Sequence, residues 1–136
     1  MSAGPRPSAR TPPPVPVETT LIAGYLAHLG PAETRPVVEQ VALDGEALLR
    51  RIHAAAADGA DTDRVRRLAH DLAGTIGSLG FAVHAAMARA IETAVPDPDP
   101  ATLARWLLPL GALRGRIAAS ALAALDELVA RKEKVP

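Results

Sequence analysis

The chain has 136 residues, of which 49% are hydrophobic, and its basic and acidic residues balance to a net charge of zero. This balance gives no support for nucleic-acid binding by bulk electrostatics, and the lack of cysteine excludes disulfides, cysteine-based metal sites and thiol chemistry. No apolar run approaches the roughly 18–20 residues of a membrane span, and no signal peptide is recognisable. We therefore expect a cytoplasmic protein that contacts neither nucleic acid nor membrane.

The first segment, residues 1–17, holds six of the thirteen prolines and few large apolar side chains. Proline fixes the backbone φ angle and removes a hydrogen-bond donor, and such a composition offers little burial to offset the entropy of ordering. We predict a disordered proline-rich arm over 1–17 and a single folded domain over 18–133. The run Pro12–Pro16 could be a polyproline ligand, but we favour a solvated leader, because a proline-rich composition alone is a weak signal.

Two helices are predicted next from apolar residues at helical spacing. A short helix over Thr19–Leu29, stopped by Gly30 and Pro31, is expected to lie across one end of the domain. A second helix should begin between Thr34 and Pro36, because proline suits a first turn, and should end near Ala57. The residues expected to face inward are Leu21, Ile22, Tyr25, Leu26 and Leu29, followed by Val37, Val41, Leu48, Ile52 and Ala55. Gly45 lies within this second stripe and would permit a close helix contact.

A third and a fourth helix follow. The third should start at the cap residue Asp61 or Thr62 and run to Leu79, where Gly80 stops it. The fourth should cover Ala82–Ala94, with Val83, Met87, Ala90 and Ile91 facing inward.

The last helix is predicted over Ala101–Lys132 and contains Pro109 and Gly111. Its apolar stripe stays in phase across these residues, which indicates one long helix kinked near Pro109, with two helices meeting near Gly111 as the alternative. Only one Trp, one Tyr and one Phe are present, so the core must be aliphatic, which favours packed helices. The fold class is all-α: an antiparallel up-and-down four-helix bundle with a short extra N-terminal helix.

The most informative stretch is the third helix. At about 100° per residue, its apolar residues fall within an arc of roughly 80°, and His70 lies about 160° from the centre of that arc. The residues of the arc are Val65, Leu68, Leu72, Ile76 and Leu79. The nearest surface neighbours of His70 toward the C-terminus are Ala73, Gly74 and Gly77, which carry almost no side chain. A glycine in a helix costs about 1 kcal/mol relative to alanine, so two on one face suggest that something large approaches the imidazole.

This stretch resembles the signature of histidine-containing phosphotransfer (HPt) domains. The matching residues are Ala69-His70-Asp71-Leu72-Ala73-Gly74 with Gly80, then Leu79-Gly80-Phe81 and the ending Ala90-Ile91-Glu92. The resemblance reaches back to Leu26 and covers most of the chain. It implies a helical bundle in which His70 carries a phosphoryl group. Many family members have Lys at the position of Ala73, although alanine there is not unusual for the family.

The resemblance further implies a multistep relay between histidine and aspartate, with a response-regulator receiver domain and a hybrid or other sensor histidine kinase as partners. An imidazole with its ordinary pKa of about 6.5 is a good nucleophile near neutral pH. The chain has no Walker-type loop or other recognisable nucleotide site, so it is not a self-sufficient kinase. We expect no cofactor on this chain, and expect Mg²⁺ on the receiver domain.

The remaining site predictions concern the surroundings of His70. Ala73, Gly74 and Gly77 would leave room for the partner's loops. Arg66 and Arg67 would supply positive charge and would partly replace the lysine. Each has a structural alternative: close helix packing for Gly74, and ordinary solvated side chains for the arginines.

Two other functions fit the sequence. One is a non-phosphorylated helical adaptor that binds and regulates a kinase or response regulator, which the lack of the lysine favours. The other is a dimerising phosphotransfer bundle, because His-Asp-Leu also opens the histidine motif of such proteins. We expect a monomer, since every apolar stripe can be buried within one bundle.

Overall fold

The structure is a computed structural model that describes residues 14–59 and 61–134. Within these ranges the chain forms helices and no strand, as the all-α prediction requires. The helices in chain order are α2 (Thr20–Leu29), α3 (Pro31–Ala57), α4 (Thr62–Gly77), α5 (Ala82–Thr93), α6 (Pro100–Gly111) and α7 (Ile117–Lys134).

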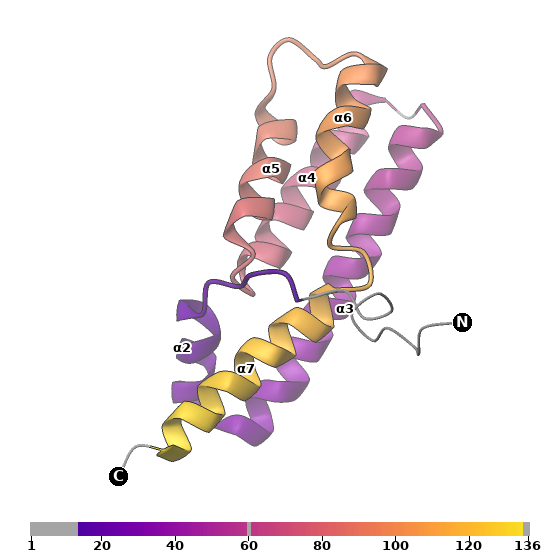
Figure 1. The fold of residues 1–136 in the computed structure, drawn as a ribbon. Helices are drawn as coiled ribbons and strands as arrows, with labels where there is room; N and C mark the ends of the chain where they lie inside the picture. Colours follow the sequence, from indigo (N-terminus) through magenta and orange to yellow (C-terminus); the bar gives the residue numbers. More distant parts are fainter. Residues whose placement is uncertain (1–13, 60, 135–136) are drawn as a thin grey trace, which may run out of the picture.

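Helices α3, α4, α5 and α6 form an antiparallel up-and-down bundle (Figure 1). The N-terminal half of α3 extends beyond this bundle, where it packs with α2 and α7. The predicted four-helix bundle with a short extra N-terminal helix is therefore confirmed. The helix α2 lies beside α3 and α7 and prolongs the bundle at its end.

Helix starts follow the capping residues. The side chain of Asp61 accepts a hydrogen bond from the Arg64 amide at 2.8 Å, and Asp99 accepts one from the Thr102 amide at 2.8 Å. The expected start of the third helix is thus confirmed. The expected start of the second helix is wrong: α3 begins at Pro31, directly after Gly30, and contains Pro36 in its interior. Pro31 is the proline that occupies the first turn, because Gly30 with φ +80° already separates α2 from α3.

The prediction of one long C-terminal helix is wrong, and the alternative of two helices is confirmed, because α6 ends at Gly111 and α7 begins at Ile117. The chain between them turns at Gly115, whose φ of +73° is a conformation that glycine adopts readily. The carboxylate of Glu46 accepts hydrogen bonds from the Gly115 amide at 2.6 and 3.0 Å, and Leu113 is fully buried in the turn. Both helices pack on the long helix α3, so their apolar residues stay in phase although the helix is broken.

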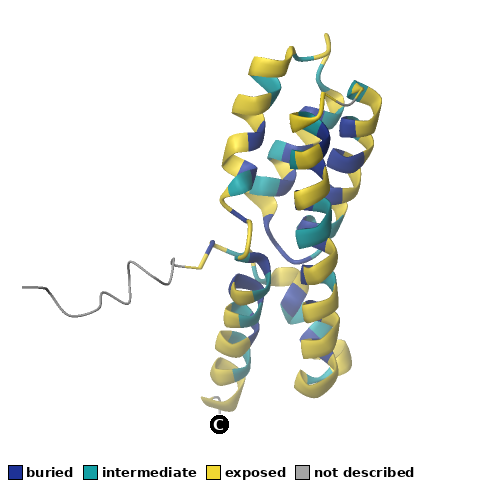
Figure 2. Cartoon of the chain, turned by 90° about the vertical axis from the view of Figure 1, so that its right-hand side faces the viewer, coloured by how far each residue is buried: buried dark blue, intermediate teal, exposed yellow. Residues whose placement is uncertain are grey.

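The core runs along the inner faces of the helices, where Figure 2 shows the buried residues. The stripe predicted for α4 is confirmed in full, since all five of its residues are at most 5% exposed. Three other stripes are partly wrong. In α2, Leu21 and Leu29 are 44% and 40% exposed, and Ile22 and Leu26 are the buried residues. Val37 on α3 and Val83 on α5 are 38% and 66% exposed, and the buried positions are Val38 and Ala85, one and two residues further along the chain. Ala90 is also exposed. Alanine-rich helices have apolar residues on several faces, so the sequence defines the buried face poorly.

The close contact predicted at Gly45 is confirmed. A Cβ at this position would lie 3.3 Å from Ile117 Cδ1 and 3.3 Å from Ile76 Cγ2. These side chains belong to the start of α7 and the end of α4. Gly45 therefore marks the place where α3 passes from the four-helix bundle to the part packed with α7.

The segment before α2 is packed against the bundle. The Val15 amide donates to Ser120 Oγ at 2.8 Å, and the Glu18 amide donates to the Gly80 carbonyl at 2.8 Å. Val15 is only 9% exposed. The predicted disordered arm over 1–17 is therefore wrong for residues 14–17, which pack against the core. The rest of the arm, including the first two residues of the proposed polyproline ligand, lies outside the described residues. None of the described helices is both long and apolar enough to cross a membrane.

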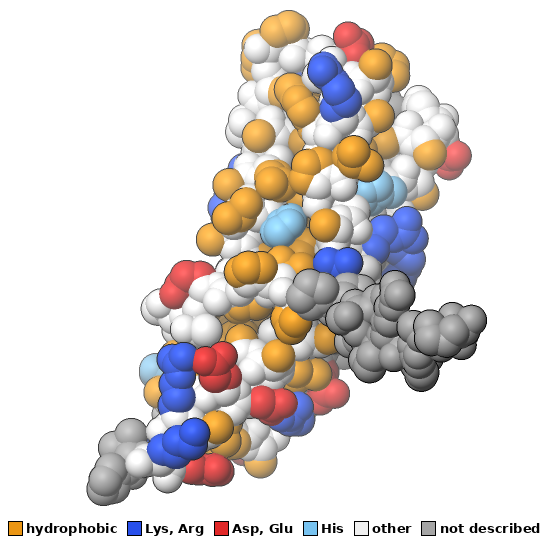
Figure 3. All heavy atoms as spheres, in the orientation of Figure 1, with side chains coloured by type: hydrophobic (Ala, Val, Ile, Leu, Met, Phe, Trp, Pro, Cys, Tyr) orange, Lys and Arg blue, Asp and Glu red, His pale blue; other side chains and the backbone are white. Residues whose placement is uncertain are grey.

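The face of α5 and α6 carries many hydrophobic side chains, whereas charged side chains of both signs gather over α7 (Figure 3). His84 on α5 is partly buried, and this burial lowers the pKa of its imidazole. Its neutral form is therefore the one that the folded state favours.

Lowering the pH from 7.5 to 5.5 is expected to destabilise the protein through His84. The unfolded chain takes up a proton at the ordinary histidine pKa of about 6.5, whereas the folded state resists it. The stability that neutral His84 contributes is thus fully present above the unfolded pKa of about 6.5, and it is lost as the pH falls toward the lower pKa of the folded state. Thermal melts at both pH values should show a smaller pH-dependent decrease in His84→Gln than in the wild type. An identical decrease in both would contradict this.

Candidate functional site

His70 lies midway along α4, on the face opposite the core. Its side chain is 69% exposed, whereas the neighbouring residues Ala69 and Leu72 are fully buried. The amphipathic pattern of α4 produces this arrangement, because burial of its apolar stripe fixes the rotation of the helix. The structure therefore places His70 where an incoming molecule can reach it.

One ring nitrogen of His70 is engaged by a carboxylate from the next helix. His70 Nδ1 lies 2.7 Å from Oε2 of Glu92 near the end of α5. A carboxylate accepts hydrogen bonds, so the proton of the neutral ring belongs on Nδ1, and Nε2 keeps its lone pair. The exposed ring can thus act as a nucleophile through Nε2. The sequence contained Glu92 in the Ala90-Ile91-Glu92 ending but gave no way of knowing that it would meet His70.

The three small residues next to His70 have different surroundings. Gly74 is exposed, and a Cβ at this position would meet nothing within 4 Å. Its alternative explanation, close packing of helices, is therefore excluded. Gly77 is partly buried, with its Cβ position 3.5 Å from Ala85 Cβ on α5. Ala73 is 2% exposed. Because Ala73 belongs to the buried core, its assignment to the docking face is wrong. Gly77 lies against α5, and its role as a docking residue stays a prediction.

The two arginines before His70 also differ. Arg66 Nη2 donates to the Ala94 carbonyl and pairs with Asp97, so this guanidinium ties α4 to the turn after α5. The pairing with Asp97 partly neutralises this charge. Arg66 still lines a hollow together with His70 and Glu92, so its predicted contribution of positive charge stays a prediction. Arg67 is exposed and makes no hydrogen bond or ion pair through its side chain within the described part of the chain. Its predicted contribution of positive charge stays a prediction.

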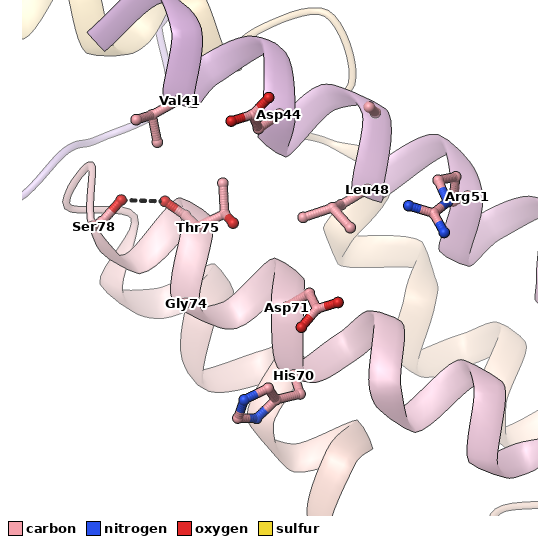
Figure 4. A pocket seen from close by; sticks show the side chains of 10 residues that line it. Val41, Asp44, Leu48, Arg51, His70, Asp71, Gly74, Thr75 and Ser78 are labelled. Atoms are coloured by element: carbon pink, nitrogen blue, oxygen red, sulfur yellow. Dashed lines mark hydrogen bonds between the residues drawn. The ribbon is translucent and has the colours of Figure 1, made fainter. Parts of the chain in front are cut away.

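A shallow groove of about 710 Å³ lies between α3 and α4. Figure 4 shows Val41 and Leu48 extending from α3 toward α4, with the His70 ring at the edge of the groove. The carboxylates of Asp44 and Asp71 and the guanidinium of Arg51 also line it. The groove therefore combines an apolar floor with charges of both signs, next to Gly74 and His70.

Among residues 14–59 and 61–134, no group of three or more histidine, cysteine or acidic residues could hold a metal ion. The chemistry that this site can perform is nucleophilic attack by Nε2, with Glu92 stabilising the positive charge that develops on the ring. The ring is open to solvent, so an electrophile as large as a second protein domain can be presented to it.

Comparison with known protein families matches residues 36–131 to the Hpt domain. The matched range begins within α3 and ends within α7, and so it includes His70, Glu92 and the groove between α3 and α4. No curated protein and no solved structure matches the chain.

Proposed function

The chain belongs to the Hpt domain family, whose domains act in histidine phosphotransfer with receiver domains and kinases of two-component systems, and we propose that His70 carries the phosphoryl group between receiver-domain aspartates. The single observation that supports this most strongly is the state of the imidazole. Nδ1 contacts the Glu92 carboxylate, and the ring is otherwise open to solvent.

The proposed transfer starts from an aspartyl phosphate on a partner receiver. The lone pair of Nε2 attacks phosphorus, a P–N bond forms, and the P–O bond to the aspartate breaks, which releases a carboxylate. The ring then carries a positive charge, which the hydrogen bond from Nδ1 to Glu92 stabilises. In the second half, an aspartate of the next receiver attacks phosphorus, the P–N bond breaks, and Nε2 regains its lone pair.

Most of this catalysis consists of positioning and of neutralising charge. We propose that the receiver docks across the groove between α3 and α4, with its active-site loops over Gly74. The apolar floor made by Val41 and Leu48 would be covered by an apolar helix face of the receiver. The open space above Gly74 lets those loops approach Nε2 closely.

The test is a transfer profile against a panel of purified, phosphorylated receiver domains in the presence of Mg²⁺, which we expect the receiver to bind. At least one receiver should transfer label to the chain within seconds to minutes, and the label should be lost in acid and kept in alkali. A label that withstands acid, or no label from any receiver that the chain binds, would contradict the proposal. Binding without label would instead identify an adaptor.

A second test uses Gly74, where stability and transfer should change in opposite directions. Gly74→Ala should stabilise the helix by up to about 1 kcal/mol, because its Cβ meets nothing and alanine is the better helix former. Gly74→Leu should slow transfer at least tenfold, since its side chain fills the space proposed for the receiver loops, while the melting temperature stays at or above that of the wild type. Wild-type transfer by Gly74→Leu would show that the receiver approaches from elsewhere.

A further inference from the structure

The site as described has a deficit of positive charge. A phosphoryl group on Nε2 would carry close to two negative charges beside the carboxylates of Glu92 and Asp71. Position 73 holds a buried alanine, and the guanidinium of Arg66 is already paired with Asp97. Arg67, the other predicted cation, makes no ion pair with the described residues, and it lies on the N-terminal side of His70. A cation on the other side would balance the site.

Arg89 on α5 occupies that side. Two contacts fix the register of the antiparallel pair α4 and α5: His70 meets Glu92, and Gly77 meets Ala85. Each step toward the C-terminus of α5 corresponds to one step back along α4. Arg89, three residues before Glu92, therefore lies opposite Ala73, three residues after His70.

The side chain of Arg89 extends over the surface of α4. Its Nη2 atom lies 4.0 Å from the position that a Cβ on Gly77 would occupy. Arg89 is exposed, and its side chain makes no hydrogen bond or ion pair with the residues that the structure describes. The guanidinium is thus an unpaired cation among the described residues, and it lies over the face of α4 that carries Gly74 and Gly77.

The guanidinium can also turn toward His70. From the level of Ala73, His70 lies three residues away along α4, or about 4.5 Å, and Gly77 lies four residues away, or about 6 Å. The guanidinium already spans the longer of these two axial distances, toward Gly77, so the Arg89 side chain is long enough to reach His70. Gly74 lies between, and its lack of a side chain leaves the path open.

From this register and this free guanidinium, we infer that Arg89 contacts the phosphoryl group on His70 and stabilises it during transfer, in a role that rests on the proposed function. Arginine donates hydrogen bonds in a fork that matches phosphate oxygens, and its charge is permanent. Arg89 and Arg67 would then flank the phosphoryl group from the two sides of His70, where Glu92 and Asp71 provide only negative charge.

The test compares transfer rates from a receiver that labels the wild-type chain, at receiver concentrations well below saturation. Arg89→Ala and Arg89→Gln should both slow transfer by about tenfold, as expected for the loss of one charge-assisted hydrogen bond at an exposed site. Arg89→Lys should recover most of the rate, because it restores the charge. The matched control is Arg105→Ala, an exposed arginine on α6, which should transfer like the wild type.

Thermal melts of all four variants should stay close to that of the wild type, because Arg89 makes no contact that the fold requires. Arg89→Ala and Arg89→Gln rates within twofold of the wild type would overturn the inference while leaving the proposed function intact. An equal slowing in Arg105→Ala would also overturn it, since the effect would then follow net charge. If no receiver labels the wild type, the proposed function fails, and the role of Arg89 fails with it.

Discussion

Replacing His70 by glutamine is expected to abolish the acid-labile label completely. Glutamine keeps a polar side chain of similar length but offers no nitrogen lone pair that could form a P–N bond. The fold should be unaffected, because the ring is exposed and its one hydrogen bond goes to Glu92 at the surface. The measurement is the amount of phosphate incorporated from a phosphorylated receiver at saturating time.

Two of the other three histidines provide the controls for this experiment. His53→Gln and His28→Gln change imidazoles whose ring nitrogens contact backbone carbonyls of their own or a neighbouring helix. Both variants should accept label to the same extent as the wild type. Equal labelling of His70→Gln would remove the relay interpretation, and loss of label in His53→Gln with a normal melting temperature would place the acceptor elsewhere.

Replacing Gly80 by alanine is expected to cause the largest loss of stability. Gly80 has a φ of +97°, and a Cβ there would lie 2.0 Å from the carbonyl oxygen of Glu18. The segment before α2 would have to move away from the turn between α4 and α5, which breaks the hydrogen bond from the Glu18 amide. We expect a cost of roughly 3 kcal/mol, from about 1–2 kcal/mol of backbone strain and at least about 1.5 kcal/mol for exposing a buried valine such as Val15.

Gly30→Ala separates the two contributions to this loss. Gly30 also has a positive φ, of +80°, but a Cβ there would meet nothing within 4 Å. Its replacement should cost only the backbone strain, about 1–2 kcal/mol. In thermal or denaturant unfolding, Gly80→Ala should therefore be clearly less stable than Gly30→Ala, and equal losses would show that the crossing segment adapts without cost.

The sequence predicted the buried face of α4 better than it predicted the C-terminal region of the fold. The α4 pattern was correct at every apolar position because a single stripe of Val, Leu and Ile leaves one way of burying the helix. That same stripe determined that His70 faces outward. The prediction for the C-terminal region failed because two apolar stripes can share one helical phase whether or not the helix between them is continuous. The break depends on Gly115 and on Glu46, which is distant in sequence.

The amino-acid sequence by itself determined that the protein is a helical bundle and that His70 faces outward beside small residues, since periodicity and the cost of glycine in a helix are local properties. Only the tertiary structure decided which groups surround that histidine. Glu92 contacts Nδ1 of His70, and Arg66 pairs with Asp97. Ala73 is buried in the core, and Arg89 lies on the C-terminal side of His70. Each of these placements depends on the rotation and register of α4 against α5. That register is the result of packing summed over both helices, and no short stretch of sequence specifies it.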